Sequence, residues 1–179
     1  VEFPGIILIE SSRYDEPESS VFINTVAHEV AHQWWYNMVG NDVIDEPWLD
    51  EGLTTFSAGL YFEEAYGAEG YQGVAEYWQQ YYDKAVQAGM DDAVTRSLTY
   101  FEEAADPGMY GPIVYGKGAL FFYELRKEIG DKAFFAGLQT YYQRFQYQIT
   151  TAEDLLGIFE ESAGRQLDAF YQEWLYSPE

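Results

Sequence analysis

Both histidines of this 179-residue chain fall within five consecutive residues, His28-Glu29-Val30-Ala31-His32. Apolar side chains recur every four positions through this segment, as Phe22, Val26, Val30 and Trp34. This periodicity predicts a helix over about 24–38. Four residues of a helix rotate by about 400°, so the two imidazoles lie one turn apart on the same face. The two side chains can therefore converge on one ion.

The chain contains no cysteine, so any bound metal would be held by histidines and carboxylates. An HExxH segment on a helix is typical of zinc hydrolases, in which the intervening glutamate is the general base. Glu29 lies about 100° round the helix from His28, where it can reach a zinc-activated water without binding the metal. The alternative is a helix that carries two ordinary packed or solvated histidines.

A third ligand decides between these readings. Catalytic zinc sites keep three protein ligands and one open position, and two histidines with a glutamate are a standard set. Glu51 follows His32 after eighteen intervening residues, in the segment Trp48-Leu49-Asp50-Glu51-Gly52. That spacing lets the first helix end and a second, predicted over about 48–65, present the carboxylate. We therefore expect His28, His32 and Glu51 to hold one zinc ion.

The rest of the chain predicts a mostly α fold with a little β structure at its N-terminus. Residues 3–9 are an apolar β-branched run that predicts a strand, and Pro4 favours an edge position. The helix over 48–65 closes at Gly67. Further helices are predicted over about 69–88, 113–129, 131–146, 151–164 and 166–176. We expect about seven helices in a single domain, 1–179, as the chain length suggests.

Three local features add detail to this prediction. The helix over 69–88 carries a broad aromatic stripe that predicts core packing, formed by Tyr71, Val74, Tyr77, Trp78, Tyr81 and Tyr82. The stretch 89–112 contains two turn signals and is long for a loop, so it is a candidate cleft wall. Thr151 with Asp154 resembles a capping box at a helix start.

Composition excludes several classes of function. Nine Lys and Arg stand against 31 Asp and Glu, a net charge of −22, which argues against binding to DNA, RNA or anionic membranes. A 47% hydrophobic and 19% aromatic composition is too apolar for a disordered chain. No apolar run approaches the length of a transmembrane helix, and no targeting signal is recognisable, so cytoplasmic and extracellular locations both stay open.

The sequence resembles the gluzincin zinc aminopeptidases, the family of membrane alanyl aminopeptidase, whose catalytic domain is thermolysin-like. The family's HExxH, eighteen residues and a glutamate in a W-L-N-E-G context correspond to His28, His32 and Glu51, with Asp50 in place of the usual Asn. Residues 114–119, Val-Tyr-Gly-Lys-Gly-Ala, match the family's Y-x-K-G-A segment. The resemblance implies that Tyr115 stabilises the transition state.

The resemblance extends to both ends of the chain. Residues 1–5, Val-Glu-Phe-Pro-Gly, resemble the tail of the G-x-M-E-N exopeptidase motif, which implies that Glu2 binds the substrate's free amine. Residues 167–170 and 174–175 are similar to the close of the catalytic domain. The resemblance also implies a partial chain: the helical C-terminal part of that domain, without its first strands and the N-terminal β-rich domain, which this part would contact.

The leading hypothesis is a zinc metallopeptidase that releases N-terminal residues from peptides with a free N-terminus. Glu29 would move the proton, and Asp50 or Asp45 would orient the histidines by accepting their second N–H. One alternative is a zinc endopeptidase or another zinc hydrolase of the same fold. The other is a non-catalytic acidic helical binding module. As an isolated fragment the chain would have an open cleft, which is one reason for it to be inactive.

Overall fold

The computed structural model describes residues 1–104 and 106–176, with Glu2 described by its backbone alone. Its helices are α1 (Ser20–Ala31), α2 (Trp48–Gln87), α3 (Leu98–Glu103), α4 (Gly118–Ile129), α5 (Asp131–Phe145), α6 (Ala152–Ala163) and α7 (Asp168–Tyr171). Two π-helices, Gly111–Lys117 and Gln172–Tyr176, and two short 3₁₀ helices, Ser11–Asp15 and Pro107–Met109, join them. The strands are β1 (Glu2–Phe3), β2 (Ile6–Ile7), β3 (Val39–Asn41) and β4 (Gln148–Thr150). The mostly α prediction is therefore confirmed.

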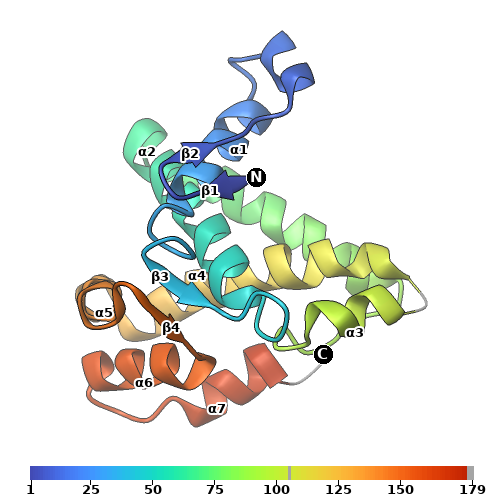
Figure 1. Ribbon diagram of the computed structural model, residues 1–179. Coiled ribbons are helices and arrows are strands. Elements are labelled where there is room, and N and C mark those ends of the chain that lie inside the picture. Colours follow the sequence, from blue (N-terminus) through green and yellow to red (C-terminus); the bar gives the residue numbers. More distant parts are fainter. Residues whose placement is uncertain (105, 177–179) are drawn as a thin grey trace.

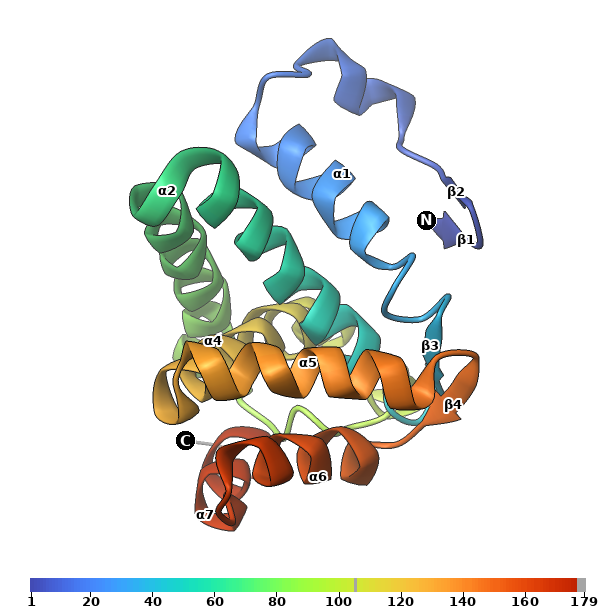
Figure 2. The same cartoon turned by 90° about the vertical axis from the view of Figure 1, so that its left-hand side faces the viewer.

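Helix α2 is bent at Gly67, whose φ of 72° and ψ of −165° are not helical. Glycine tolerates this positive φ because it has no Cβ. The first arm of α2, residues 48–66, and the second arm, 68–87, therefore run in different directions, and Figure 2 shows α2 turning back on itself beside α1. The two predicted helices on either side of Gly67 are confirmed. The prediction omitted α3 and counted the two arms of α2 as two helices. The predicted and observed totals are both seven, but the helices counted are not the same ones.

The predicted β structure at the N-terminus is confirmed, but the run over 3–9 is not one continuous strand. Phe3 and Ile6 are paired across an antiparallel hairpin of β1 and β2, with Pro4 and Gly5 at the turn. Gly5 has a φ of 80°, and Pro followed by a glycine with positive φ is the combination that favours a tight turn. The Pro-Gly pair thus divides one apolar run into two short strands.

The helix that carries the HExxH segment begins earlier and ends earlier than the predicted 24–38. The side chain of Ser19 accepts a hydrogen bond from the backbone N–H of Phe22 at 3.2 Å, so Ser19 is the N-cap of α1. At the other end, Tyr36 adopts a φ of 101° and the chain turns into β3. Strand β3 pairs in parallel with β4, a contact between distant segments that local periodicity does not reveal.

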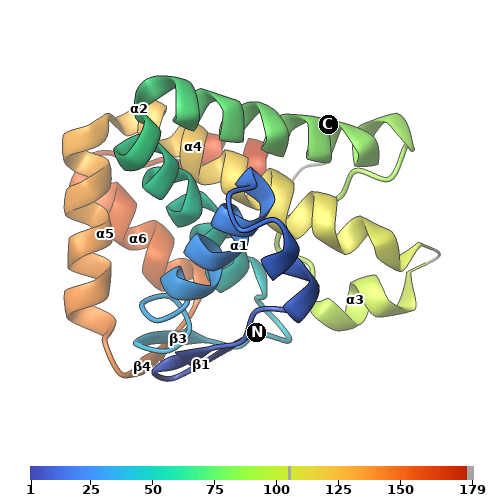
Figure 3. The same ribbon diagram turned by 90° about the horizontal axis from the view of Figure 1, so that it is seen from above.

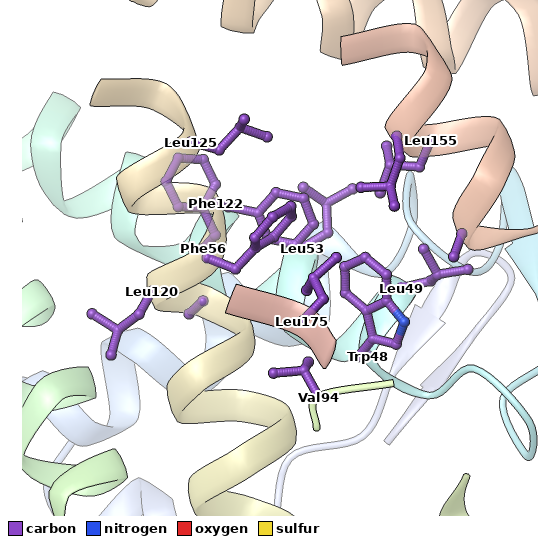
Figure 4. Packing of buried hydrophobic residues seen from close by; sticks show 14 of the residues in the cluster. Trp48, Leu49, Leu53, Phe56, Val94, Leu120, Phe122, Leu125, Leu155 and Leu175 are labelled. Carbon is purple, nitrogen blue, oxygen red and sulfur yellow. The ribbon is translucent and has the colours of Figure 1, made fainter. Parts of the chain in front are cut away.

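The core lies between the first arm of α2, α4 and α6. Figure 4 shows Trp48, Leu53 and Phe56 of α2 packed against Phe122 of α4 and Leu155 of α6. In Figure 1 and Figure 3, α5 and α6 lie at one end of the molecule. Figure 2 shows α1 between α2 and the β1–β2 hairpin. Of the predicted aromatic stripe on the second arm, Trp78 and Tyr82 are buried, but Tyr77 is 60% exposed and was wrongly assigned to the core.

The stretch 89–112 is partly helical, since it contains α3 and a 3₁₀ helix. A groove of about 740 Å³ lies elsewhere, between the N-terminal end of α1 and the bent part of α2. Residues 89–112 do not line this groove. Among the described residues, no helix is both long enough and apolar enough to cross a membrane.

Candidate metal centre

The three predicted metal ligands meet at one point, between the C-terminal end of α1 and the beginning of α2. His28 lies in the last turn of α1, and His32 is the residue that ends it, with helical backbone angles. The spacing of four residues therefore keeps both rings on one face. Glu51 lies in the first turn of α2. Helix α2 packs against α1, which brings Glu51 across to the histidines.

The facing atoms of these side chains form a nearly equilateral triangle. Nε2 of His28 and Nε2 of His32 are 3.1 Å apart. Oε2 of Glu51 lies 3.2 Å from Nε2 of His28 and 3.4 Å from Nε2 of His32. Two corners of a tetrahedral zinc site with ligand distances of 2.0–2.1 Å are about 3.3 Å apart. The three atoms thus already have the mutual separations that one tetrahedral ion requires.

The chemistry of the donors also fits a cation. Oε2 of Glu51 is buried, and among the described residues it has no hydrogen-bond partner. Burial alone would raise the pKa of Glu51, but the neighbouring imidazoles of His28 and His32 lower it well below the ordinary value, so the carboxylate is ionised. A buried ionised oxygen without a hydrogen bond is costly unless a positive charge faces it.

The second ring nitrogens are held by groups other than the two predicted aspartates. Nδ1 of His32 lies 3.2 Å from the carbonyl oxygen of Trp35 and 3.3 Å from Oγ1 of Thr54. Nδ1 of His28 lies 3.3 Å from Oγ1 of Thr55. A carbonyl can only accept, so Nδ1 of His32 donates. In the neutral ring this leaves Nε2 as the nitrogen that can bind a metal.

Asp50 and Asp45 therefore do not take the orienting positions that the sequence suggested. The buried carboxylate of Asp50 accepts a hydrogen bond from Nδ2 of Asn41 at 3.1 Å, and burial raises its pKa to about 7. Asp45 is exposed, and its backbone N–H donates to the side chain of Asp42. The signal for Thr54 and Thr55 was present in the sequence, because residues three and four positions after Glu51 share its helix face.

Glu29 lies beside the ligand triangle without belonging to it. Its side chain is 14% exposed, and the group of side chains able to share one metal consists of the two histidines and Glu51. Oε2 of Glu29 is buried and lies 2.7 Å from the backbone nitrogen of Val1. Strand β1 therefore passes directly beside this carboxylate.

Tyr115 reaches the same site from the π-helix Gly111–Lys117. Its ring stacks on that of His28, with centroids 5.8 Å apart, and Tyr110 lies 5.8 Å away on another side. Burial raises the pKa of the Tyr115 phenol above its ordinary value, and the charge of Glu51 raises it further. The phenol is therefore protonated and able to donate. Tyr110, which the sequence analysis missed, has no recognisable motif of its own.

The side chain of Glu2 lies outside the described residues, but the backbone of its strand lies close to the site. The backbone N–H of Gly5 donates to Oε1 of Gln33 at 2.8 Å, and Nε2 of Gln33 donates to the carbonyl of Phe3 at 3.1 Å. Gln33 directly follows His32, so one side chain ties the turn of the hairpin to the end of the HExxH segment.

Comparisons with known proteins show which family the chain resembles. A model of the peptidase family M1 domain matches residues 3–174. Among curated proteins, an aminopeptidase N of Lactococcus lactis subsp. cremoris is 31% identical over 168 residues, 90% of this chain and 19% of that protein. A second aminopeptidase N, from Lactococcus lactis subsp. lactis, is 28% identical over 163 residues, 86% of this chain and 18% of that protein.

Solved structures give the same result. An M1 zinc metallopeptidase from Deinococcus radiodurans superposes with a TM-score of 0.67 at 26% identity, over 87% of this chain and 33% of that one. Native yeast LTA4 hydrolase superposes with a TM-score of 0.73 at 21% identity, over 88% of this chain and 26% of that one, which shows a shared fold. This chain spans about a fifth of the length of the curated relatives and at most a third of these structures.

Proposed function

This chain belongs to the peptidase family M1, and we propose that it is the helical part of the catalytic domain of a zinc-dependent aminopeptidase. The observation that carries the proposal is the ligand triangle, because the ligand atoms of His28, His32 and Glu51 are 3.1–3.4 Å apart, as one tetrahedral ion requires. The family implies zinc, and the geometry of three ligands supports one ion per chain. Its substrates would be peptides with a free N-terminus.

Zinc held by these three residues would polarise the substrate carbonyl and lower the pKa of a water molecule to about 7. The chain's own residues prepare that site. The carbonyl of Trp35 fixes the tautomer of His32, and Thr55 supports His28. These contacts orient both rings before the ion arrives, which is what tightens metal binding at such sites.

Glu29 is proposed to be the general base and then the general acid. It is next to His28 in sequence and is not a member of the ligand group, so its carboxylate is available for a proton. It would accept the proton from the attacking water and pass it to the leaving amine. Its largely buried position keeps competing water away from that proton.

Tyr115 is proposed to donate a hydrogen bond to the oxygen that becomes negative when the peptide carbonyl is attacked. Its raised pKa keeps the phenol protonated at neutral pH. A single well-placed donor of this kind accounts for about 10²–10³ in kcat. Substitution Tyr115→Phe keeps the ring stacked on His28 and removes only the hydroxyl, so it isolates this role.

Glu2 is proposed to bind the ammonium group of the substrate, as the resemblance of residues 1–5 implies. The support is the placement of its strand: the hairpin lies beside Glu29 and is fixed to Gln33 by hydrogen bonds. An edge strand also offers backbone groups to an extended peptide. An endopeptidase would not need this anchor, so free and N-acetylated peptides separate the two functions. Equal hydrolysis of both would contradict the aminopeptidase assignment.

The central experiment uses the longest natural chain that contains this sequence. We expect the wild type to bind about one zinc and to hydrolyse aminoacyl amides. Substitution Glu29→Gln should lower kcat by at least about 10³-fold, since it removes the base, and leave the zinc content unchanged. Substitution Glu51→Gln is the matched control and should lower zinc affinity.

Zinc content is measured by mass spectrometry after purification without chelator. Full activity of Glu29→Gln would refute its role as the base. A wild type that binds zinc without any turnover of peptides would instead favour the non-catalytic binding module. Absence of zinc from the wild type would refute the proposal as a whole.

A further inference from the structure

A buried ion pair lies in the segment that carries Tyr115 and takes no part in the proposed chemistry. Lys117 is 2% exposed and Asp91 is 7% exposed. Nζ of Lys117 donates to Oδ1 of Asp91 at 2.9 Å and to Oδ2 at 3.1 Å. It also donates to the carbonyl oxygen of Asp92 at 3.1 Å and lies 5.1 Å from the centre of the Tyr82 ring.

Burying an ion pair is no gain in itself, because the desolvation cost of two charges can exceed their attraction. Packed apolar side chains would stabilise the fold as well or better. The ion pair does fix a position, however, because the ammonium contacts both carboxylate oxygens and a carbonyl at once. These three contacts restrain the segment that carries Lys117.

Lys117 is the last residue of the π-helix Gly111–Lys117, and Tyr115 lies two positions before it. A π-helix is rare, and it occurs mostly as a short local departure from an α-helix at functional sites. Helix α4 follows at Gly118 without a break. Removing the π geometry would turn residues before α4 by up to about 100° round the axis, which would direct the Tyr115 phenol away from Glu51.

Close backbone packing on both sides of Lys117 makes this segment sensitive to small shifts. A Cβ on Gly116 would lie 3.3 Å from the backbone nitrogen of Tyr82 and 3.4 Å from the carbonyl oxygen of Trp78, on the second arm of α2. A Cβ on Gly52 would lie 3.3 Å from the backbone of Gly118. Gly52 directly follows Glu51, so the π-helix rests against the helix turn that carries the third metal ligand.

We propose that the buried Lys117–Asp91 ion pair is a positioning device that fixes the π-helix and thereby directs the Tyr115 hydroxyl at the reacting carbonyl. Asp91 belongs to the segment that follows α2, so the ion pair ties the π-helix to the end of that helix. Lys117 and Asp91 act through Tyr115 and do not touch the substrate. This inference rests on the proposed aminopeptidase function.

The test removes both partners together, because removing one would leave a buried charge unpaired. In Lys117→Met/Asp91→Asn we expect kcat to fall by about 10²–10³-fold, as for loss of a single transition-state donor. KM should change by less than about twofold and the zinc content should stay at the wild-type level, since the ligands are untouched.

A double-mutant cycle shows whether the ion pair acts through Tyr115. Adding Tyr115→Phe to Lys117→Met/Asp91→Asn should lower kcat no further, because the hydroxyl is already misdirected. Losses that multiply in the combined variant would overturn the proposal. If the double substitution does not fold, Asp91→Asn alone serves, with a smaller loss of kcat expected and an unchanged kcat overturning the inference.

The chain offers a matched control for a merely structural effect. Arg126 is 11% exposed and pairs with Glu63 at 2.6 Å and with Asp131 at 2.8 Å, at the opposite end of α4 from Tyr115. The control Arg126→Met/Glu63→Gln should lower Tm and leave kcat within about twofold of the wild type. An equal fall of kcat in the control would overturn the positioning role of the Lys117–Asp91 ion pair.

The wild type assayed beside these variants separates the two proposals. Turnover by the wild type with no loss in Lys117→Met/Asp91→Asn refutes the positioning role alone. A wild type that holds zinc but has no peptidase activity refutes the proposed function and this inference with it.

Discussion

The two helices that supply the metal ligands are packed very differently. Of the twelve residues of α1, only Ala31 is buried, and Val21 and Val30 are 55% and 40% exposed. The first arm of α2 is the centre of the core, with Trp48, Leu53 and Phe56 all fully buried. Glu51 is therefore placed by the core, whereas His28 and His32 are placed by a helix that packs on one side only.

This difference suggests how stability and function are divided. Within this chain, α1 has few apolar contacts to hold it, so it belongs to the parts that open most easily. The first arm of α2 opens only when the whole core does. A metal ion bound between the two would fasten the weakly held helix to the strongly held one.

The largest expected effect is on stability, and it compares the packing of the first arm of α2 with that of α1. Substitution Phe56→Ala should lower the free energy of unfolding by about 3–5 kcal/mol, because Phe56 is fully buried and its ring meets those of Phe122 and Phe134. Substitution Phe22→Ala in α1 should lower it by about 1 kcal/mol, since its ring meets only the exposed Tyr14 in the described aromatic pairs. Urea unfolding measures both, and equal losses would contradict the comparison.

The next largest effect is a different response of the two helices to removal of the metal. At free zinc about 100-fold above Kd, bound zinc stabilises the fold by about 2.7 kcal/mol, and a chelator removes that contribution. We expect faster hydrogen exchange of the α1 amides after chelation, with the amides of the first α2 arm changing little. Exchange that rises equally in both helices would show that α1 is not the weakly held partner. The variant Glu51→Gln serves as the control, because it binds zinc more weakly and chelation should then change the exchange of α1 less.

The smallest effect concerns the cap of α1. Substitution Ser19→Ala removes the hydrogen bond to the N–H of Phe22 and should cost about 1 kcal/mol. The matched control is Thr151→Ala, which removes the cap of α6 at about the same cost. Only Ser19→Ala should weaken zinc binding in a chelator competition titration, since α1 carries His28 and α6 carries no metal ligand. Equal zinc affinity of the two variants would contradict this expectation.

Features that depend on a few adjacent residues were predictable from the sequence. The spacing of His28 and His32 implies a shared helix face, and the interval to Glu51 implies a second helix that returns to it. The bend at Gly67 and the capping box of Thr151 with Asp154 are likewise local, and the structure confirms both.

Features that depend on contacts between distant segments were not predictable. Strands β3 and β4 are only three residues each and pair across more than a hundred residues, so neither has a periodic pattern of its own. The π-helix has the same apolar pattern as an α-helix, and residues 113–129 were accordingly predicted as one ordinary helix. The prediction of one strand over 3–9 failed for a different reason, because the turn signal of Pro4 and Gly5 was visible in the sequence and was not used.

By itself the sequence determined which side chains could share a metal: with two histidines, no cysteine and one suitably spaced glutamate, the choice was nearly forced by helix geometry. Only the tertiary structure decided how those side chains are held. Thr54, Thr55 and the carbonyl of Trp35 contact the histidines where Asp50 and Asp45 were expected. Asp91 pairs with Lys117, in the same π-helix as Tyr115. Helix phase is a local property of the chain, whereas the distance between two helices depends on everything packed between them.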